Sequence, residues 1–87
     1  MPKSVFSDRY QAFLVGLITA RREAGLTQVD LSKRLGKPQS FVSKIETGER
    51  RLDFVEFIDV ARAIGVDELQ LAAKILASPS FGQNAGL

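Results

Sequence analysis

The sequence predicts an all-α domain of five helices, and three observations support this fold class. Apolar side chains recur every three or four residues in five successive segments, which is the spacing of a helix that buries one face. Ser, Thr, Asp or Pro precedes these segments and Gly follows most of them, as at helix starts and stops. No stretch alternates apolar and polar residues as a half-buried strand does. The 87 residues make a single domain, which we expect to span residues 1–76.

The first two helices are predicted from their caps and their stops. Ser7 is a suitable N-cap for the first helix, which Gly25 should end. Thr27 should cap the second helix, with Asp30 three residues on as its partner in a capping box, and Gly36 should end it. The apolar positions are Phe6, Tyr10, Phe13, Leu14, Leu17 and Ile18 in the first helix, and Val29, Leu31 and Leu35 in the second.

The third helix is predicted to start near Pro38, because proline fits the first turn of a helix, and to run to about Thr47. Gly48 follows as its left-handed stop. At 100° per residue its apolar arc holds Phe41, Val42 and Ile45, and its outer arc holds Gln39, Ser40, Ser43, Lys44 and Thr47. Gln can bond adenine through two hydrogen bonds and Lys can reach guanine acceptors, so this outer arc suits the major groove of DNA.

Two further helices are predicted after Asp53 and Asp67, which serve as N-caps. The fourth should end at Gly65 and hold Phe54, Phe57, Ile58, Ala61 and Ile64. The fifth has Leu71 and Ile75 on one side and Leu69, Ala73 and Leu76 on the other, an apolar arc wider than one core contact needs. The second side is therefore a candidate dimer face, unless Phe81 folds back and covers it. Residues 77–87 are small, polar and rich in Gly, so we expect a flexible tail.

The charge is unevenly distributed along the chain. Residues 1–20, 21–51 and 52–87 carry net charges of +1, +4 and −3. The basic segment coincides with the second and third helices. Such asymmetry suits a domain with one face for nucleic acid and another face for a different contact.

The composition argues against enzymatic chemistry. The chain has no Cys and no His, which removes thiolate nucleophiles, imidazole bases and the usual zinc ligands, so we expect no metal and no cofactor. Asp53, Glu56 and Asp59 are best explained as the acidic start of a helix. No glycine pattern matches a phosphate-binding loop. No apolar run could span a membrane and no signal peptide is recognisable, so we expect a cytoplasmic protein.

The second helix, the Gly36-Lys37-Pro38 turn and the third helix match the plan of a helix-turn-helix. Here the chain resembles the phage repressor/Cro-like (Xre) family of bacterial transcriptional regulators. The matching text is REAGLTQVDLSKRLGKPQSFVSKIETGERRLD followed by FIDVARAIGV, within residues 8–66. The resemblance implies a lambda-repressor-like fold, with its helix-turn-helix at the second and third helices.

The resemblance also implies roles for particular residues. It assigns base reading to Gln39, Ser40, Ser43 and Lys44. It assigns phosphate contacts to Gln28, Thr47, Arg50 and Arg51, and Gln28 would also brace the third helix. It pairs Arg21 with Glu46 as a structural ion pair between the first and third helices. Pro38 departs from the family pattern, which often has a small polar cap at that position.

The function predicted is sequence-specific binding of double-stranded DNA as a transcriptional regulator, in the first instance a repressor. A homodimer on a roughly palindromic operator is the expected assembly. Two alternatives stay open. The chain could be the antitoxin of a toxin–antitoxin pair, with a small protein as partner, or an adaptor that kept the fold without binding DNA.

Overall fold

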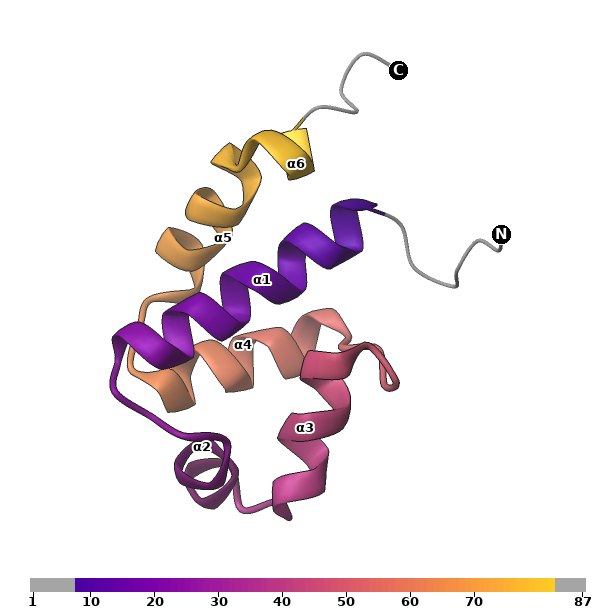
Figure 1. Ribbon diagram of the computed structural model, residues 1–87. Helices are drawn as coiled ribbons and strands as arrows, with labels where there is room; N and C mark the ends of the chain where they lie inside the picture. The colour runs from indigo at the N-terminus through magenta and orange to yellow at the C-terminus, as the bar shows by residue number, and fades with distance from the viewer. Residues whose placement is uncertain (1–7, 83–87) are drawn as a thin grey trace.

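The computed structural model describes residues 8–82, and these residues form helices joined by short loops (Figure 1). The all-α class and the five predicted helices are confirmed, and a short sixth helix follows them. The helices are α1 (Asp8–Glu23), α2 (Gln28–Leu35), α3 (Gln39–Thr47), α4 (Phe54–Ile64), α5 (Glu68–Ala77) and α6 (Pro79–Gly82).

Local capping explains where most of the helices start. Thr27 and Asp30 form both hydrogen bonds of a capping box at α2, as predicted. Asp53 caps α4, and Glu56 completes a second capping box that the sequence analysis did not anticipate. Asp67 caps α5 through the backbone N–H of Gln70. The predicted N-cap of α1, Ser7, lies outside the described residues.

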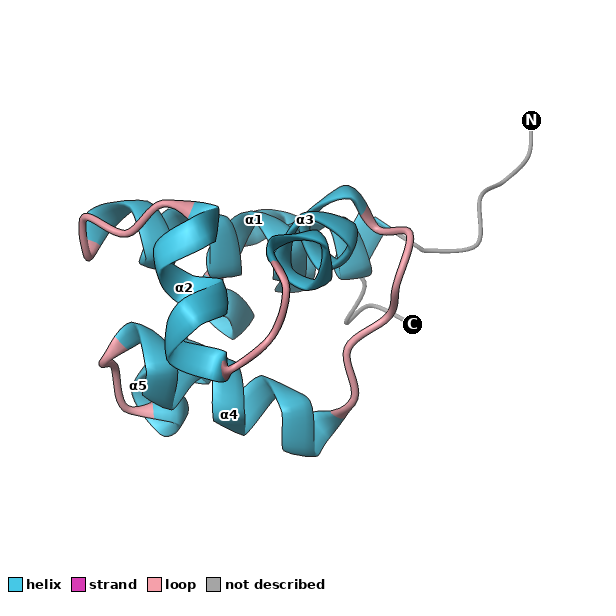
Figure 2. Ribbon diagram, turned by 90° about the horizontal axis from the view of Figure 1, so that it is seen from below, coloured by secondary structure: helices cyan, strands magenta, loops and turns pink. Residues whose placement is uncertain are grey.

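The turn between α2 and α3 depends on one glycine and one proline. Gly36 has φ 69°, a left-handed backbone that side chains with a Cβ rarely adopt, and it ends α2. Pro38 has φ −68° and is the N-cap of α3, one residue earlier than the first helical turn in which it was predicted. It offers no side-chain cap, so α3 begins at Gln39 without one. Figure 2 shows the short loop that this turn forms between the two helices.

A single apolar core lies between the helices. The buried side chains come from all of the first five helices, so each contributes to the same cluster: Leu14, Leu17, Leu31, Val42, Ile45, Phe57, Val60, Ala61, Ile64, Leu71 and Ile75. The predicted core positions on α3, Val42 and Ile45, are both almost fully buried. Burial of this face fixes the rotation of α3 about its axis, and the polar residues of α3 therefore point outward.

The structure differs from the sequence analysis at three places. Val29 and Phe54 are exposed rather than in the core, and Phe54 has 74% of its surface accessible. Residues 79–82 form α6 instead of continuing a flexible tail. Phe81 of α6 packs against the core, and the guanidinium carbon of Arg9 lies 4.8 Å from the centre of its ring. Contacts with α1 and α5, which the local sequence does not reveal, explain why this turn is ordered.

Candidate nucleic-acid interface

The outer arc of α3 presents polar side chains to solvent. Gln39, Ser40, Lys44 and Thr47 are exposed, and Ser43 is half-buried. Within the described part of the chain no ion pair involves Lys44. The five residues predicted for this arc therefore share one face of one helix, and that face carries a cation and no acid.

Beneath this arc lies a buried ion pair between Arg21 of α1 and Glu46 of α3. Nε of Arg21 donates to Oε2 of Glu46 at 2.7 Å, and Nη2 donates to Oε1 at 2.9 Å. Their side chains are only 8% and 9% exposed. Nη1 of Arg21 also donates to the Leu26 carbonyl, in the loop between α1 and α2, at 2.8 Å. The two residues that the resemblance paired thus lie together, and they join α1 to α3 and to the loop before α2.

Hydrogen bonds continue from Glu46 to the surface through two glutamines. The Gln28 amide nitrogen donates to Oε1 of Glu46 at 2.9 Å, and the Gln39 amide nitrogen donates to the Gln28 amide oxygen at 3.0 Å. Carboxylate oxygens only accept, so Glu46 orients the amide of Gln28, and the Gln28 oxygen in turn orients the amide of Gln39. This leaves the oxygen and one N–H of Gln39 directed away from these partners.

Arg50 forms an ion pair with Glu56, an acid that the sequence analysis explained as part of a helix start. Its guanidinium donates to both carboxylate oxygens of Glu56, at 3.1 and 2.8 Å. The same guanidinium carbon lies 4.8 Å from the centre of the Phe41 ring, and Nζ of Lys37 lies 5.2 Å from that centre. Phe41 is therefore half-buried under two cations rather than fully in the core.

Arg51 lies against an aromatic ring, whereas the Thr47 hydroxyl lies near two oxygen atoms. The Arg51 guanidinium carbon lies 4.1 Å from the centre of the Tyr10 ring, and the Tyr10 hydroxyl accepts a hydrogen bond from the Leu52 backbone at 3.0 Å. The Thr47 hydroxyl lies 3.2 Å from the Lys44 carbonyl oxygen and 3.3 Å from Oε2 of Glu49. Tyr10 thus positions the loop after α3, and Arg51 remains exposed at its surface.

The Arg50–Glu56 contact predicts a pH dependence of stability. The Arg50 guanidinium and then the Asp53 backbone N–H lower the pKa of Glu56 from 4.5 to about 2. A carboxyl with a depressed pKa stabilises the fold above its unfolded value of 4.5, and this contribution disappears as the pH falls toward 2. Glu56→Gln should therefore melt a few degrees below the parent at neutral pH and should match it near pH 2. The shift is small because solvent screens a pair this exposed.

Thermal melts from neutral pH down to pH 2 measure this difference. Asp59→Asn, an exposed acid of the same helix, is the matched control. A difference between Glu56→Gln and the parent that stays constant over this range would contradict the assignment.

Three contacts beside the candidate interface could not be read from the sequence: Glu56 with Arg50, Tyr10 with the loop, and Phe41 under its cations. Tyr10 and Leu52 are 42 positions apart, and no local spacing connects them. Glu56 did carry one usable signal, because an acid three residues after an Asp N-cap completes a capping box.

The geometry defines a helix-turn-helix domain, and comparison with known proteins gives the same class. A helix-turn-helix family matches residues 17–75. The chain is 36% identical over 62 residues to a protein described as the uncharacterized HTH-type transcriptional regulator y4dJ of Sinorhizobium fredii, covering 71% of this chain and 79% of that protein. It also resembles the solved structure of an XRE-family like protein from Pseudomonas syringae pv. tomato, with a TM-score of 0.75 and 56% identity over 79% of this chain and 84% of the other.

The chain therefore belongs to the Cro/C1-type (XRE) helix-turn-helix family. This family is one of transcriptional regulators rather than enzymes, in agreement with the sequence analysis. In residues 8–82 no helix has the length and apolar character needed to cross a membrane. No cluster of potential metal ligands occurs within that same range.

Proposed function

We propose that this protein binds double-stranded DNA in a sequence-specific manner, with α3 in the major groove, and that it regulates transcription, in the first instance as a repressor. The observation that carries the proposal is the outer arc of α3, which is polar, basic and supported from below by the hydrogen-bonded chain from Arg21 to Gln39. A bacterial regulator of this kind acts in the cytoplasm, where its DNA lies.

Gln39 is the residue best prepared to read a base. Its free amide oxygen can accept from adenine N6, and its remaining N–H can donate to adenine N7, which together form the two-bond pairing of Gln with adenine. The Gln28 contact holds the amide in this orientation before DNA arrives. Lys44 can reach guanine acceptors, and the hydroxyls of Ser40 and Ser43 can adapt to several base edges.

Phosphate contacts are proposed for the residues that flank this arc: Gln28, Thr47, Arg50 and Arg51. Gln28 donates one amide hydrogen to Glu46 and keeps a second for a phosphate oxygen. The charge of Arg50 is paired with Glu56. We therefore expect Arg50 to contribute less than one full phosphate contact.

Phosphate contacts by these two arginines predict how strongly salt weakens binding. Arg51→Gln should weaken binding to cognate and random DNA alike and should reduce the slope of log K against log salt by about 1, the value for one phosphate. Arg50→Gln should reduce the slope by less than the value for one phosphate, because Glu56 already pairs with that charge. Fluorescence anisotropy at several salt concentrations measures both slopes, and Arg51→Lys, which keeps the charge, is the control. A reduction for Arg50→Gln as large as that for one phosphate, or a changed sequence preference in either variant, would oppose these roles.

Selection from a random double-stranded DNA library tests the proposed function directly. The parent protein should enrich one motif, and that motif should bind at least a thousandfold more tightly than random DNA, the low end for specific regulators. An adaptor without DNA-binding activity would enrich nothing. If the enriched motif were bound no better than random DNA, binding would be explained by electrostatic attraction to phosphates alone. That result would contradict the proposal.

We also propose a homodimer formed through the outer face of α5, namely Leu69, Ala73 and Leu76. Leu69 is 76% exposed and Leu76 is 58% exposed. Phe81 lines the same hollow as Leu76, yet Leu76 keeps more than half of its surface accessible, which supports a further partner for this face. Exposed Phe54 of α4 lines this hollow too and extends the apolar surface. Apolar surface of this kind, exposed on two adjoining helices, is typical of an interaction site.

The dimer makes a prediction for sedimentation and for the operator. The parent should sediment as a dimer at micromolar concentration, and the Leu69→Glu/Leu76→Glu double variant as a monomer. Two copies of α3 should then lie one DNA turn apart, about 34–36 Å, on a roughly palindromic site. Val29→Glu, which places a charge on exposed apolar surface of α2, is the control. A parent that is monomeric both free and on DNA would exclude this interface.

A further inference from the structure

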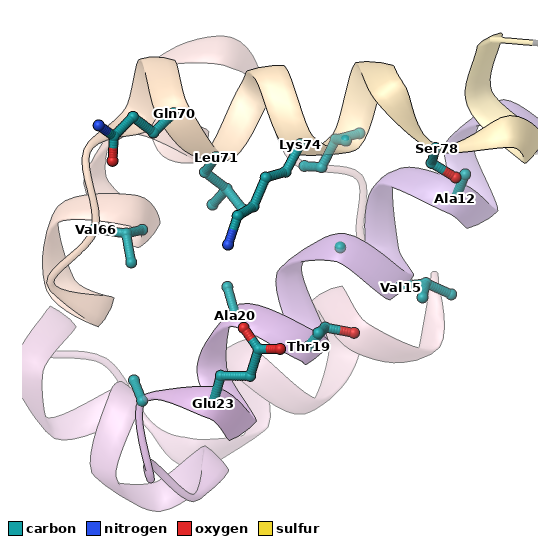
Figure 3. Close-up of a pocket in the computed structure, with 13 residues that line it drawn as sticks. Ala12, Val15, Thr19, Ala20, Glu23, Val66, Gln70, Leu71, Lys74 and Ser78 are labelled. Atoms are coloured by element: carbon teal, nitrogen blue, oxygen red, sulfur yellow. The ribbon is translucent and has the colours of Figure 1, made fainter.

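A groove between α1 and α5 is not used by the proposed DNA contacts or by the proposed dimer face (Figure 3). Its volume is about 380 Å³, within the range of roughly 300–1,000 Å³ of pockets that bind small molecules. The apolar lining includes Ala12, Gly16, Ala20, Val66, Leu71 and Ile75. On α5 the groove runs along the side of the helix that carries Gln70 and Lys74. Leu69, Ala73 and Leu76 lie on the outward side of the same helix.

The hollow exists because small residues face α5 along α1. A Cβ added at Gly16 would lie 2.5 Å from Cγ1 of Ile75, so the two helices approach closely at this point only because Gly16 has no side chain. On either side of that contact the α1 positions are Ala12 and Ala20, which are too short to fill the space between the helices. Close approach at one position and short side chains beside it leave an apolar surface open to solvent.

Two opposite charges face each other across the mouth of this groove. They are the only charged residues of its lining: Glu23 at the end of α1 and Lys74 on α5. Figure 3 shows the Lys74 ammonium directed from α5 toward α1 and the Glu23 carboxylate directed from α1 toward α5. No ion pair joins them in the described part of the chain, and both side chains are exposed. A ligand can therefore meet both charges without first breaking a contact between them.

We propose that this groove binds a small zwitterion with an apolar body, of the class of an α-amino acid with an aliphatic side chain. The ligand carboxylate pairs with the Lys74 ammonium, and the ligand ammonium pairs with the Glu23 carboxylate. The aliphatic side chain lies on the apolar floor formed by Gly16, Ala20 and Leu71. An apolar cleft with a few convergent polar groups is the usual composition of a small-molecule site. The single pair of opposite charges matches a zwitterion, whereas a docked helix would be held by anchors repeated every three or four residues.

Titration of the full chain with leucine, followed by NMR of the backbone amides, tests the proposal. We expect shift changes at Gly16, Ala20 and Lys74, and none at Gln39 or Ser40. Leucine amide lacks the carboxylate and N-acetyl-leucine lacks the ammonium, so each should bind at least tenfold more weakly than leucine. Glycine, which lacks the apolar body, should bind more weakly as well.

Two single variants locate the charges without disturbing the core, since both side chains are exposed. Lys74→Met and Glu23→Gln should each weaken leucine binding at least tenfold, and Lys33→Met, an exposed lysine of α2, should leave it unchanged. The proposal is overturned if millimolar leucine shifts no groove amide. It is equally overturned if both analogues bind as well as leucine, or if dilution of the protein alone moves the Gly16 and Ala20 amides of α1, which lie away from the proposed dimer face; that result would assign the groove to a second copy of the chain.

Discussion

Replacing Glu46 with Ala is expected to lower the free energy of unfolding by about 3–5 kcal/mol, the usual cost of removing one partner of a buried ion pair. Glu46 accepts hydrogen bonds from both Arg21 and Gln28. Arg21 is only 6% exposed, and without Glu46 its guanidinium would keep just the Leu26 carbonyl among the acceptors described above. A domain of this size has a total stability of only about 5–15 kcal/mol, so the variant should lose a large fraction of it.

Urea denaturation of the parent and the variant measures this loss. Glu49→Ala, which removes an exposed acid just beyond α3, is the control and should change stability little. The stability of Glu46→Gln should lie between those of Glu46→Ala and Glu49→Ala, because the new amide oxygen can still accept a hydrogen bond from Arg21 but carries no charge. If Glu46→Ala and Arg21→Ala both unfold at the urea concentration of the parent, the pair does not stabilise the fold.

Replacing Gln39 with Ala should weaken binding to the selected operator by about 1–3 kcal/mol per half-site and should relax the preference for adenine at one position. The effect should be specific to the cognate sequence, because the residue reads a base edge and neutralises no phosphate. Affinity for random DNA and the salt slope should therefore stay unchanged. The fold should also be unaffected, since Gln39 is exposed.

Two further glutamine variants sharpen this test. Gln11→Ala on α1 removes an exposed amide that makes no proposed DNA contact, and it should bind as the parent does. Gln39→Glu keeps the size of the side chain, but its carboxylate can only accept hydrogen bonds. The variant should therefore lose the preference for adenine, and its carboxylate should be repelled by the Gln28 amide oxygen. Full retention of operator affinity and preference by Gln39→Ala would show that another residue reads this base.

The sequence was a good guide wherever the controlling interaction is local. Thr27 with Asp30 closes a capping box over three residues, Asp53 caps α4, and Gly36 ends α2 by its own backbone freedom. The spacing of Val42 and Ile45 determined which side of α3 is buried and therefore which polar side chains point outward. Such interactions act within one turn of a helix, so their partners can be counted along the chain. The resemblance added the Arg21–Glu46 pair, which spacing could not have provided.

The sequence was a poor guide where residues distant in the chain, or on different helices, must meet. Phe54 and Val29 have apolar side chains at helical spacing, yet no neighbouring helix covers them and they are exposed. Arg50 has a basic side chain after the groove helix, but the approach of α4 places Glu56 against it and balances its charge. Residues 79–82 look like a tail, and only their contacts with α1 and α5 make them helical.

The sequence by itself therefore determined the first five helices, the caps of α2, α4 and α5 and the polar face of α3, because these depend on interactions within a few residues. The tertiary structure alone decided the rest: the bond between Gln28 and Gln39, the neutralised charge of Arg50, the exposed apolar side of α5 and the groove beside Gly16. These features depend on how far apart two packed helices lie and which side chains face each other. Packing of the whole core sets those distances, and no spacing along the chain encodes them.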